Sequence, residues 1–158
     1  MPNEAAPDHP GVIAKPPYIY FGFLLAGALF GFFYPLPLAD KAGLARIAGA
    51  ILLAVGVLLM SLCVRRFNKA GTNIPTNLPV NALVTEGPYR FSRNPIYVSM
   101  TAIYVGLGLL LDNGWIIALL IPLLLIMRYG VIAREERYLE TRFGDPYRDY
   151  KARVRRWL

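Results

Sequence analysis

The chain has 158 residues, 56% of them hydrophobic, with a mean hydropathy of +0.42 and a formal net charge of +7. The single cysteine, Cys63, excludes an internal disulfide, and the single histidine, His9, argues against a histidine-based metal site or general base. The basic excess lies beside long apolar segments, so attraction to anionic lipid headgroups explains it better than binding to nucleic acid.

The chain begins with 16 residues that contain Glu4, Asp8 and several prolines. A secretory signal peptide has a positively charged start followed by an apolar stretch, and this segment has neither. We therefore predict a flexible tail at 1–16, followed by a single membrane domain at 17–158.

Four apolar segments follow, at 17–38, 44–64, 96–111 and 115–132. Each comes close to the roughly 20 mostly apolar residues that a transmembrane helix needs, although the third is short. The alternative is a soluble protein with buried core helices, but such helices rarely have apolar runs beyond roughly 10 to 14 residues. We therefore predict an all-α integral membrane protein with about four transmembrane helices.

Basic residues are distributed unevenly between the connections. Five lie in the loop 65–95 and eight follow residue 132, whereas Lys41 is the one basic residue in the opposite connections. The positive-inside rule places the long loop and both termini in the cytoplasm, and we interpret the membrane as a bacterial inner membrane.

The long loop leads into the run GPYRFSRNPIY, residues 87–97, which places Arg93 and Asn94 directly before the third apolar segment. One interpretation is purely structural, because Asn94 suits a helix N-cap and Pro95 suits the first helical position. That interpretation leaves Tyr89 and Arg93 unexplained. Free amides at a helix start beside an arginine suit a carboxylate or phosphate, so the alternative is a binding site.

The third apolar segment contains Gly106 and Gly108 in the run YVGLG. A nucleotide-binding fingerprint needs a strand before its glycines and a helix after them, so glycines inside an apolar helix argue against a Rossmann domain. Two interpretations stay open. The glycines either permit close packing of helices or mark a place where a ligand contacts the backbone.

A second polar cluster, in the run AREERYLETRF, follows the fourth apolar segment. If the helix continues, Glu136 shares one face with Ile132, Leu139 and Phe143, so an acid lies on an otherwise apolar stripe. An acid directed toward a helical bundle near the membrane edge is costly without a partner. The alternative is that Glu135 and Glu136 form a solvated surface pair among arginines.

The chain ends in the run DPYRDYKARVRRWL. Asp145 and Pro146 suit a helix cap and a first helical turn. We predict an amphipathic helix on the cytoplasmic surface, within an interfacial helical tail at 133–158. Its apolar face would consist of Tyr147, Tyr150, Val154 and Trp157.

The run GPYRFSRNPIY, the glutamate pair and the run FGDPYRDYKARVRRW, in this order, resemble a family of membrane methyltransferases. These are the proteins related to isoprenylcysteine carboxyl methyltransferase and the phospholipid N-methyltransferases. The family has an Arg-His-Pro-x-Tyr run followed by a Glu-Glu pair, and it uses S-adenosylmethionine. Arg93, Pro95 and Tyr97 match the first motif, and Glu135 and Glu136 match the second.

Gly106 and Gly108 match a small Gly-x-Gly element of the phospholipid branch of that family. Asn94 departs from the pattern, which has histidine at this position. Asparagine can cap a helix and hydrogen-bond a ligand, but it cannot accept a proton. This departure favours the carboxylate of an isoprenylcysteine-like substrate, or a thiol, over an amine as the methyl acceptor.

The resemblance implies a shared site for S-adenosylmethionine, in which Arg93 would hold a carboxylate of the donor or of the acceptor. Glu135 or Glu136 would hold the ammonium or the sugar diol, and aromatic rings would lie near the sulfonium. Arg93 is the candidate catalytic residue. The candidate cofactor-binding residues are Tyr89, Asn94, Pro95, Tyr97, Gly106, Gly108, Glu135 and Glu136.

Methyl transfer requires alignment of the reacting groups and exclusion of water, with no covalent enzyme intermediate. The expected partners are membrane lipids and a lipophilic acceptor that enters from the lipid phase, with no nucleic acid and no obligate protein partner. The alternatives are methylation of a phospholipid headgroup amine, a non-enzymatic membrane scaffold, and a reductase that resembles the steroid reductases and uses a nicotinamide cofactor.

Overall fold

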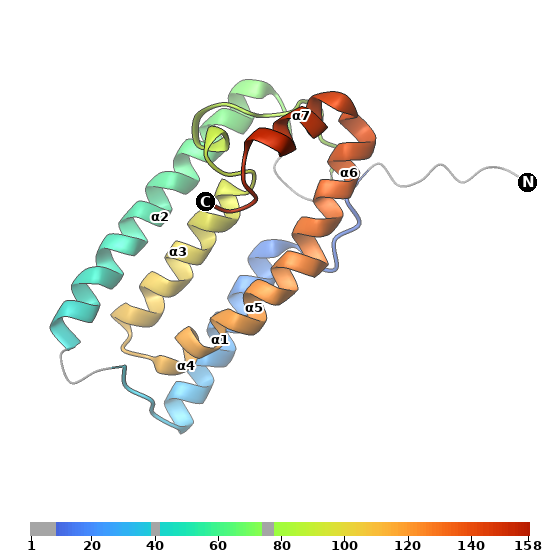
Figure 1. The fold of residues 1–158 in the computed structure, drawn as a ribbon. Coiled ribbons are helices and arrows are strands. Elements are labelled where there is room, and N and C mark those ends of the chain that lie inside the picture. Colours follow the sequence, from blue (N-terminus) through green and yellow to red (C-terminus); the bar gives the residue numbers. More distant parts are fainter. Residues whose placement is uncertain (1–8, 39–41, 74–77) are drawn as a thin grey trace, which may run out of the picture.

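The computed structural model describes residues 9–38, 42–73 and 78–158, and these ranges contain no β-strand. The elements are α1 (Pro16–Phe33), α2 (Ala42–Ala70), the 3-10 helix η1 (Gly87–Arg90), α3 (Pro95–Leu110), α4 (Gly114–Ala118), α5 (Leu120–Ile126), the π-helix η2 (Met127–Ile132), α6 (Ala133–Phe143) and α7 (Asp145–Arg153) (Figure 1). The predicted all-α architecture is confirmed.

In the described part of the chain, three segments are long and apolar enough to cross a membrane: Pro16–Phe33, Gly43–Ala70 and Gly114–Phe143. Of the four predicted spans, the third corresponds to α3, an apolar helix of 16 residues that is shorter than the other three. The long helices keep large apolar side chains exposed at helical spacing, such as Ile47 and Ile51 on α2. An outward face of this kind suits lipid, so the chain is an integral membrane protein.

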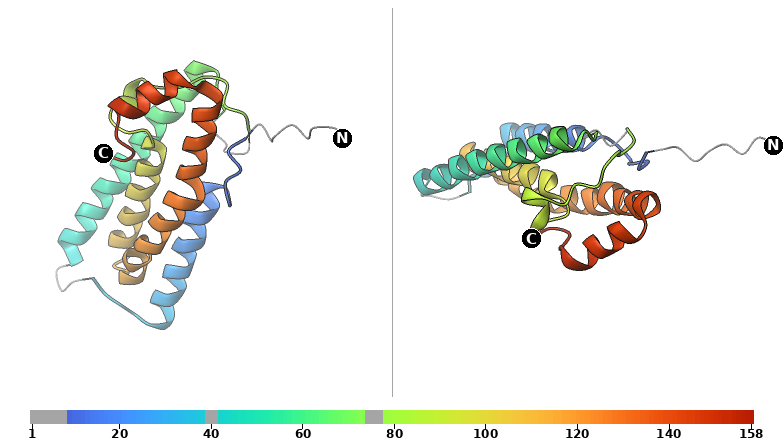
Figure 2. Two further views of the ribbon diagram at one scale, coloured as in Figure 1. Left: turned by 45° about the vertical axis from the view of Figure 1, so that its right-hand side comes forward. Right: turned by 90° about the horizontal axis from the view of Figure 1, so that it is seen from above.

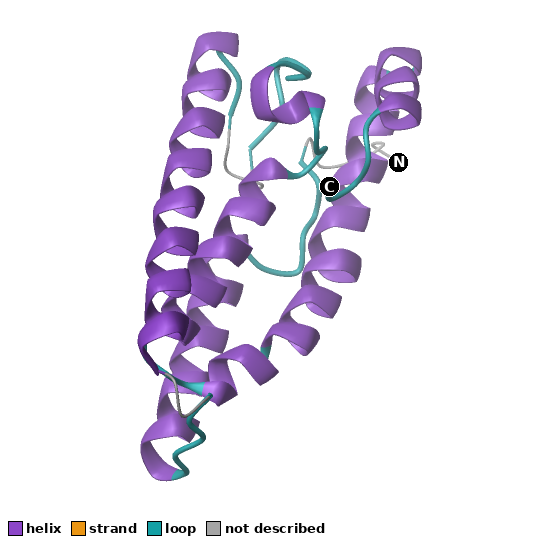
Figure 3. Ribbon diagram, turned by 60° about the vertical axis from the view of Figure 1, so that its left-hand side comes forward, coloured by secondary structure: helices purple, strands orange, loops and turns teal. Residues whose placement is uncertain are grey.

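The helices lie in two neighbouring pairs (Figures 1 and 2). Helix α2 packs along α3, and α1 lies beside α4 and α5. Fully buried side chains such as Ile116 and Leu123 belong to the core between these elements. The connection between α2 and α3, helix α7 and the C-terminal segment gather at one end of the bundle, which we call the polar end (Figure 3).

Asn113 fixes the opposite end of the bundle. Its Oδ1 accepts hydrogen bonds from the backbone N–H groups of Trp115 (3.0 Å) and Ile116 (3.2 Å), and its Nδ2 donates to the carbonyl of Gly27 (3.2 Å). A side-chain cap of this kind contributes about 1 kcal/mol to stability. The same side chain therefore begins α4 and joins it to α1.

Of the predicted N-terminal tail, residues 1–8 lie outside the described residues. Farther along, the tail runs beside η2, where the N–H of Ile13 donates to the carbonyl of Gly130 at 3.2 Å. Lys41, which the sequence assigns to the opposite connections, also lies outside the described part of the chain.

The last long helical segment changes geometry just before the polar end. The π-helix η2 has i→i+5 hydrogen bonding, and such turns inside α-helices are frequent at functional sites. The regular helix α6 follows at once and carries both glutamates in its first turn. Helix α6 therefore directs Glu136 inward at the polar end.

Candidate functional site

A cavity of about 110 Å³ lies at the polar end, between the residues that precede α3, the first turns of α6, and helix α7. Apolar walls come from Leu139 and from the loop residues Val80, Ala82, Leu83 and Val84. Its polar and charged lining residues are Asn73, Tyr89, Arg93, Asn94, Tyr97, Glu135, Glu136, Tyr147 and Tyr150. The arginine motif and the glutamate pair, far apart in the sequence, therefore meet at one place.

The backbone around Arg93 is fixed on two sides. Gly87 turns the chain into η1 with a φ of 61°, a left-handed conformation that favours glycine. Helix α3 begins at Pro95, whose ring suits the first helical position. Between these points the N–H of Arg93 donates to the carbonyl of Arg155 at 2.9 Å, so the C-terminal segment holds Arg93 in place.

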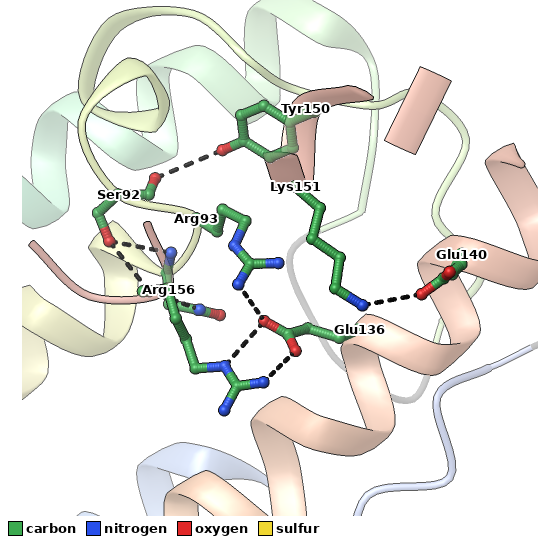
Figure 4. A network of polar contacts seen from close by, with 8 residues as sticks. Ser92, Arg93, Glu136, Glu140, Tyr150, Lys151 and Arg156 are labelled. Atoms are coloured by element: carbon green, nitrogen blue, oxygen red, sulfur yellow. Dashed lines mark hydrogen bonds and ion pairs between the residues drawn. The ribbon is translucent and has the colours of Figure 1, made fainter. Parts of the chain in front are cut away.

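Glu136 is 5% exposed and lies between two arginines (Figure 4). Arg156 donates from Nε to Oε1 at 3.0 Å and from Nη2 to Oε2 at 2.6 Å. Nη2 of Arg93 lies 3.2 Å from Oε1. A buried carboxylate needs such partners, because removing an unpaired charge from water costs several kcal/mol. The interpretation of Glu136 as a solvated surface residue is therefore wrong.

Arg93 has hydrogen-bonding capacity that the protein leaves unused. Its side chain is 10% exposed, and in the described part of the chain its Nε and Nη1 are buried without a hydrogen-bond partner. A buried donor without a partner costs about 1–3 kcal/mol, and more when it is charged. Arg93 also shares the carboxylate of Glu136 with Arg156, so Glu136 alone does not balance the charge of both arginines. Both features fit an anion bound beside Arg93.

Glu135 has a different environment from its neighbour. The hydroxyl of Tyr97 donates to its Oε1 at 2.5 Å. Among the described residues, no arginine or lysine forms an ion pair with Glu135, although it lines the same cavity. Glu135 therefore has no ion-pair partner in the described chain and is placed to receive a cation in the cavity.

The last five residues, 154–158, form what we call the C-terminal strap, which crosses the start of α3. Nδ2 of Asn94 donates to the carbonyl of Arg156 at 2.8 Å, and Oγ of Ser92 donates to the same oxygen at 3.4 Å. Asn94 stands at the predicted N-cap position of α3, but its side chain makes no hydrogen bond to the helix amides. Its Nδ2 group holds the strap instead.

The predicted tail helix is present as α7, but it ends at Arg153, so Val154 and Trp157 belong to the strap and not to the helix. Gly144 stands at its N-cap, so Asp145 is the first helical residue and not the cap. Tyr147 and Tyr150 are buried and line the cavity, and the hydroxyl of Tyr150 donates to the carbonyl of Tyr89 at 2.7 Å. Burial raises the pKa of Tyr147 to about 12 and also raises the pKa of Tyr150. Both hydroxyls therefore stay protonated at neutral pH, and the aromatic face of α7 covers the cavity.

Gly106 and Gly108, which the sequence offered as cofactor-binding residues, lie away from this cavity. A Cβ on Gly106 would approach the carbonyl oxygen of Gly49 to 2.8 Å, and one on Gly108 would approach Ile117 to 2.7 Å. They permit close helix packing, as the alternative interpretation held. Pro95 is fully buried at the start of α3 and does not line the cavity.

We expect Gly106→Ala to lower the free energy of unfolding by about 1–3 kcal/mol, because the added methyl group overpacks the contact between α2 and α3. Gly22→Ala is the matched control: no atom lies within 4 Å of its Cβ position, so it should be neutral or slightly stabilising. Thermal unfolding in detergent measures both. An unchanged unfolding midpoint for Gly106→Ala, together with weaker ligand binding, would restore the cofactor-binding interpretation.

Sequence reasoning did not identify Arg156 as a site residue. In the sequence it is one of three arginines near the C-terminus, with Arg153 and Arg155, and no spacing distinguishes it. Its role depends on the chain turning back after α7. The sequence assigned Tyr147 and Tyr150 to an apolar helix face, and both side chains are buried. The sequence did not indicate that they cover the polar cavity.

Long apolar helices and a cavity lined by charged residues at one end define this chain as an all-α membrane protein with a candidate binding site at the polar end. A family model described as phospholipid methyltransferase matches residues 44–146. The chain belongs to this family, and the family predicted from its motifs is confirmed.

Three curated proteins are similar to parts of the chain. An uncharacterized protein of Haemophilus influenzae is 44% identical over 63 residues, which are 40% of this chain and all of that protein. The cobalt-zinc-cadmium resistance protein CzcN of Cupriavidus metallidurans is 34% identical over 74 residues, 47% of this chain and 34% of CzcN. Protein-S-isoprenylcysteine O-methyltransferase of Schizosaccharomyces pombe is 38% identical over 73 residues, 46% of this chain and 30% of the yeast protein.

The matched segments thus span about a third of the length of the two relatives that carry a functional name. No solved structure matches the chain significantly. The family model therefore places the chain among membrane proteins of the phospholipid methyltransferase family, and the reaction's methyl donor and acceptor are left to be assigned.

Proposed function

We propose that the protein uses S-adenosylmethionine to methylate a lipophilic acceptor at the edge of the membrane. The observation that carries the proposal is the pair of unused, buried donors on Arg93, which share a cavity with Glu135, a carboxyl group without an ion-pair partner in the described chain. The amino-acid end of S-adenosylmethionine has a carboxylate and an ammonium group. A cavity with one anion-binding and one cation-binding group suits that end of the molecule.

In this proposal one of the unpaired donors of Arg93, Nε or Nη1, binds the carboxylate. The other donor lies on a different edge of the guanidinium and binds a second oxygen of the methyl donor, while Nη2 stays on Glu136. Glu135 binds a positive group, either the ammonium or the sulfonium, and Tyr97 orients Glu135 through its hydroxyl. When bound, the donor supplies a methyl group on a positively charged sulfur, which keeps the electrons of the broken bond. Glu136 acts indirectly, because it fixes both Arg93 and Arg156.

The cavity has to widen for the whole donor. Pockets for small molecules typically have volumes of about 300–1,000 Å³, whereas this cavity has about 110 Å³. Its irregular wall, the loop that contains Val80 and residues 82–84, can move without unfolding a helix. We expect this loop to move away from the helices around the nucleoside part of the donor.

Asn94 replaces the histidine of the family motif, and its amide group is occupied by the strap. A carboxylate or thiolate acceptor needs no general base, so the absence of a proton acceptor at position 94 does not hinder its methylation. An amine acceptor must lose a proton before it is methylated. In this site Glu135 would accept that proton, because Glu136 is paired with two arginines. Both acceptor types therefore stay within the proposal, with the first favoured.

We place the polar end in the cytoplasm, at the inner face of a bacterial cytoplasmic membrane. The arginines of α6, α7 and the strap all lie at this end, and positively charged segments remain on the cytoplasmic side. This orientation lets a water-soluble donor enter from the cytoplasm and a lipophilic acceptor enter from the membrane.

A methyl-transfer assay tests the function directly. The full chain in lipid vesicles is incubated with S-adenosylmethionine labelled in its methyl group and with total membrane lipid or an isoprenylcysteine analogue. Label is expected in an organic-soluble product, and release of labelled methanol by mild alkali identifies a methyl ester. Absence of labelled product, combined with oxidation of a nicotinamide cofactor, would favour the reductase; absence of both would favour the scaffold.

A further inference from the structure

A second cavity, of about 630 Å³, lies between α1 and α3, and we call it the apolar groove. Apolar and aromatic side chains dominate its lining, and Lys15 is its one charged lining residue in the described chain. Tyr18 and Phe21 line the groove and are largely exposed, so the groove is open along α1. Since α1 is a candidate membrane span, this opening faces lipid.

The apolar groove and the polar cavity have a common wall. Ile96 and Tyr97 line both of them. The hydroxyl of Tyr97 contacts Glu135, which lines the polar cavity and not the groove, so the Tyr97 side chain separates the two spaces. A molecule in the groove therefore lies against Ile96 and Tyr97, the wall that the groove shares with the proposed methyl-transfer site.

The groove also contains an unpaired polar group. Tyr104 is 2% exposed, lines the groove, and has a buried hydroxyl with no hydrogen-bond partner among the described residues. The neighbouring Tyr20, by contrast, is hydrogen-bonded to Thr101 and to the carbonyl of Tyr97. Leaving a buried hydroxyl unpaired is unfavourable, so Tyr104 is suited to donate to an acceptor atom on a bound molecule.

We propose that the groove binds the apolar chain of the methyl acceptor, and that Tyr104 donates a hydrogen bond to an oxygen on that chain. Tyr104 follows Tyr97 by seven residues on α3, which corresponds to about 10 Å along the helix axis. The acceptor is therefore an amphiphile with an oxygen, such as an ester carbonyl, about 10 Å from the atom that is methylated. This inference rests on the proposed function, which states that the reactive end of the acceptor molecule is methylated.

Photolabelling in vesicles tests the inference. Two single-chain alkyl amphiphiles carry a diazirine near the chain end; one has an ester carbonyl about 10 Å from its headgroup, and the other has methylene groups only. Mass spectrometry of the labelled full chain should find adducts on the groove faces of α1 and α3. Equal labelling of the outward face of α2 would show ordinary lipid contact and would overturn the inference.

Variants separate the groove from the cofactor site. Met100→Trp fills the groove and should reduce labelling at least tenfold, whereas Val57→Trp, on the exposed face of α2, should not. Tyr104→Phe keeps the ring and should abolish a preference of about fivefold for the ester-bearing probe. An unchanged preference would refute the role of Tyr104, and the wild-type labelling map remains decisive if Met100→Trp does not fold.

S-adenosylhomocysteine is the product that remains after S-adenosylmethionine gives up its methyl group, and its binding to the same samples distinguishes the two proposals. We expect Met100→Trp and Tyr104→Phe to bind S-adenosylhomocysteine like the wild type. If the wild type is labelled in the groove but does not bind S-adenosylhomocysteine, the proposed function fails and the groove remains a lipid site. If it binds S-adenosylhomocysteine and labelling is not confined to the groove, only the present inference fails.

Discussion

Arg93→Lys is expected to weaken the binding of S-adenosylhomocysteine at least a hundredfold. Lysine keeps a positive charge that can face Glu136, but it has neither the Nε donor nor the Nη1 donor that are unpaired in the cavity. Each hydrogen bond to a charged group contributes about 1.5–3 kcal/mol, so the loss of two corresponds to a factor of roughly 10² to 10⁴. Isothermal titration in detergent measures the change.

Arg90→Lys is the matched control, since Arg90 is exposed on η1 and does not line the cavity. It should bind S-adenosylhomocysteine like the wild type. We expect Arg93→Lys to change the free energy of unfolding by about 1 kcal/mol or less, because Arg156 retains its two hydrogen bonds to Glu136. Undiminished binding by Arg93→Lys would remove Arg93 from the ligand site.

Replacement by glutamine should lower mainly ligand affinity at Glu135 and mainly the free energy of unfolding at Glu136. Glu135→Gln keeps an oxygen for the Tyr97 hydroxyl but loses the charge, so we expect ligand affinity to fall roughly thirtyfold or more with little change in stability. Glu136→Gln leaves two arginines without their counter-charge in a buried place and should lower the free energy of unfolding by about 3 kcal/mol.

Thermal unfolding and titration of the folded protein, applied to both variants, separate these effects. The reverse pattern, a stability loss for Glu135→Gln and a selective affinity loss for Glu136→Gln, would exchange the two assignments. Glu140→Gln is a suitable control, because Glu140 lies on the same helix and pairs with Lys151 at 3.0 Å outside the cavity.

The long apolar segments were readable from the sequence because lipid contact requires continuous apolar stretches, whatever the packing partners. The start of α3 was equally readable, since Asn94 and Pro95 constrain the backbone locally. What Asn94 does with its side chain was not, because the carbonyl that it binds belongs to Arg156, which is distant in the sequence. Local rules describe a helix start, whereas long-range contacts decide which partner a side chain finds.

The same distinction explains the rest of the site. The apolar stripe that includes Ile132 and Leu139 indicated an inward direction for Glu136, and the structure buries that residue. The pattern could not show that Arg156 would form its ion pair with Glu136 and not with Glu135. That choice depends on the chain reversing direction after α7, which brings the strap back to α6. Gly106 shows the opposite case, in which a motif match suggested a ligand and the position packs against Gly49 instead.

The most direct measurement is the equilibrium binding of S-adenosylhomocysteine to the full wild-type chain in detergent, with NADPH as the comparison ligand. One saturable site is predicted, with an unfolding midpoint that rises as the ligand concentration increases; a hundredfold excess over Kd adds about 2.7 kcal/mol of stability. NADPH should produce no such shift. If S-adenosylhomocysteine does not bind, or if Arg93→Lys binds it equally well, the cavity at the polar end is not the methyl-donor site.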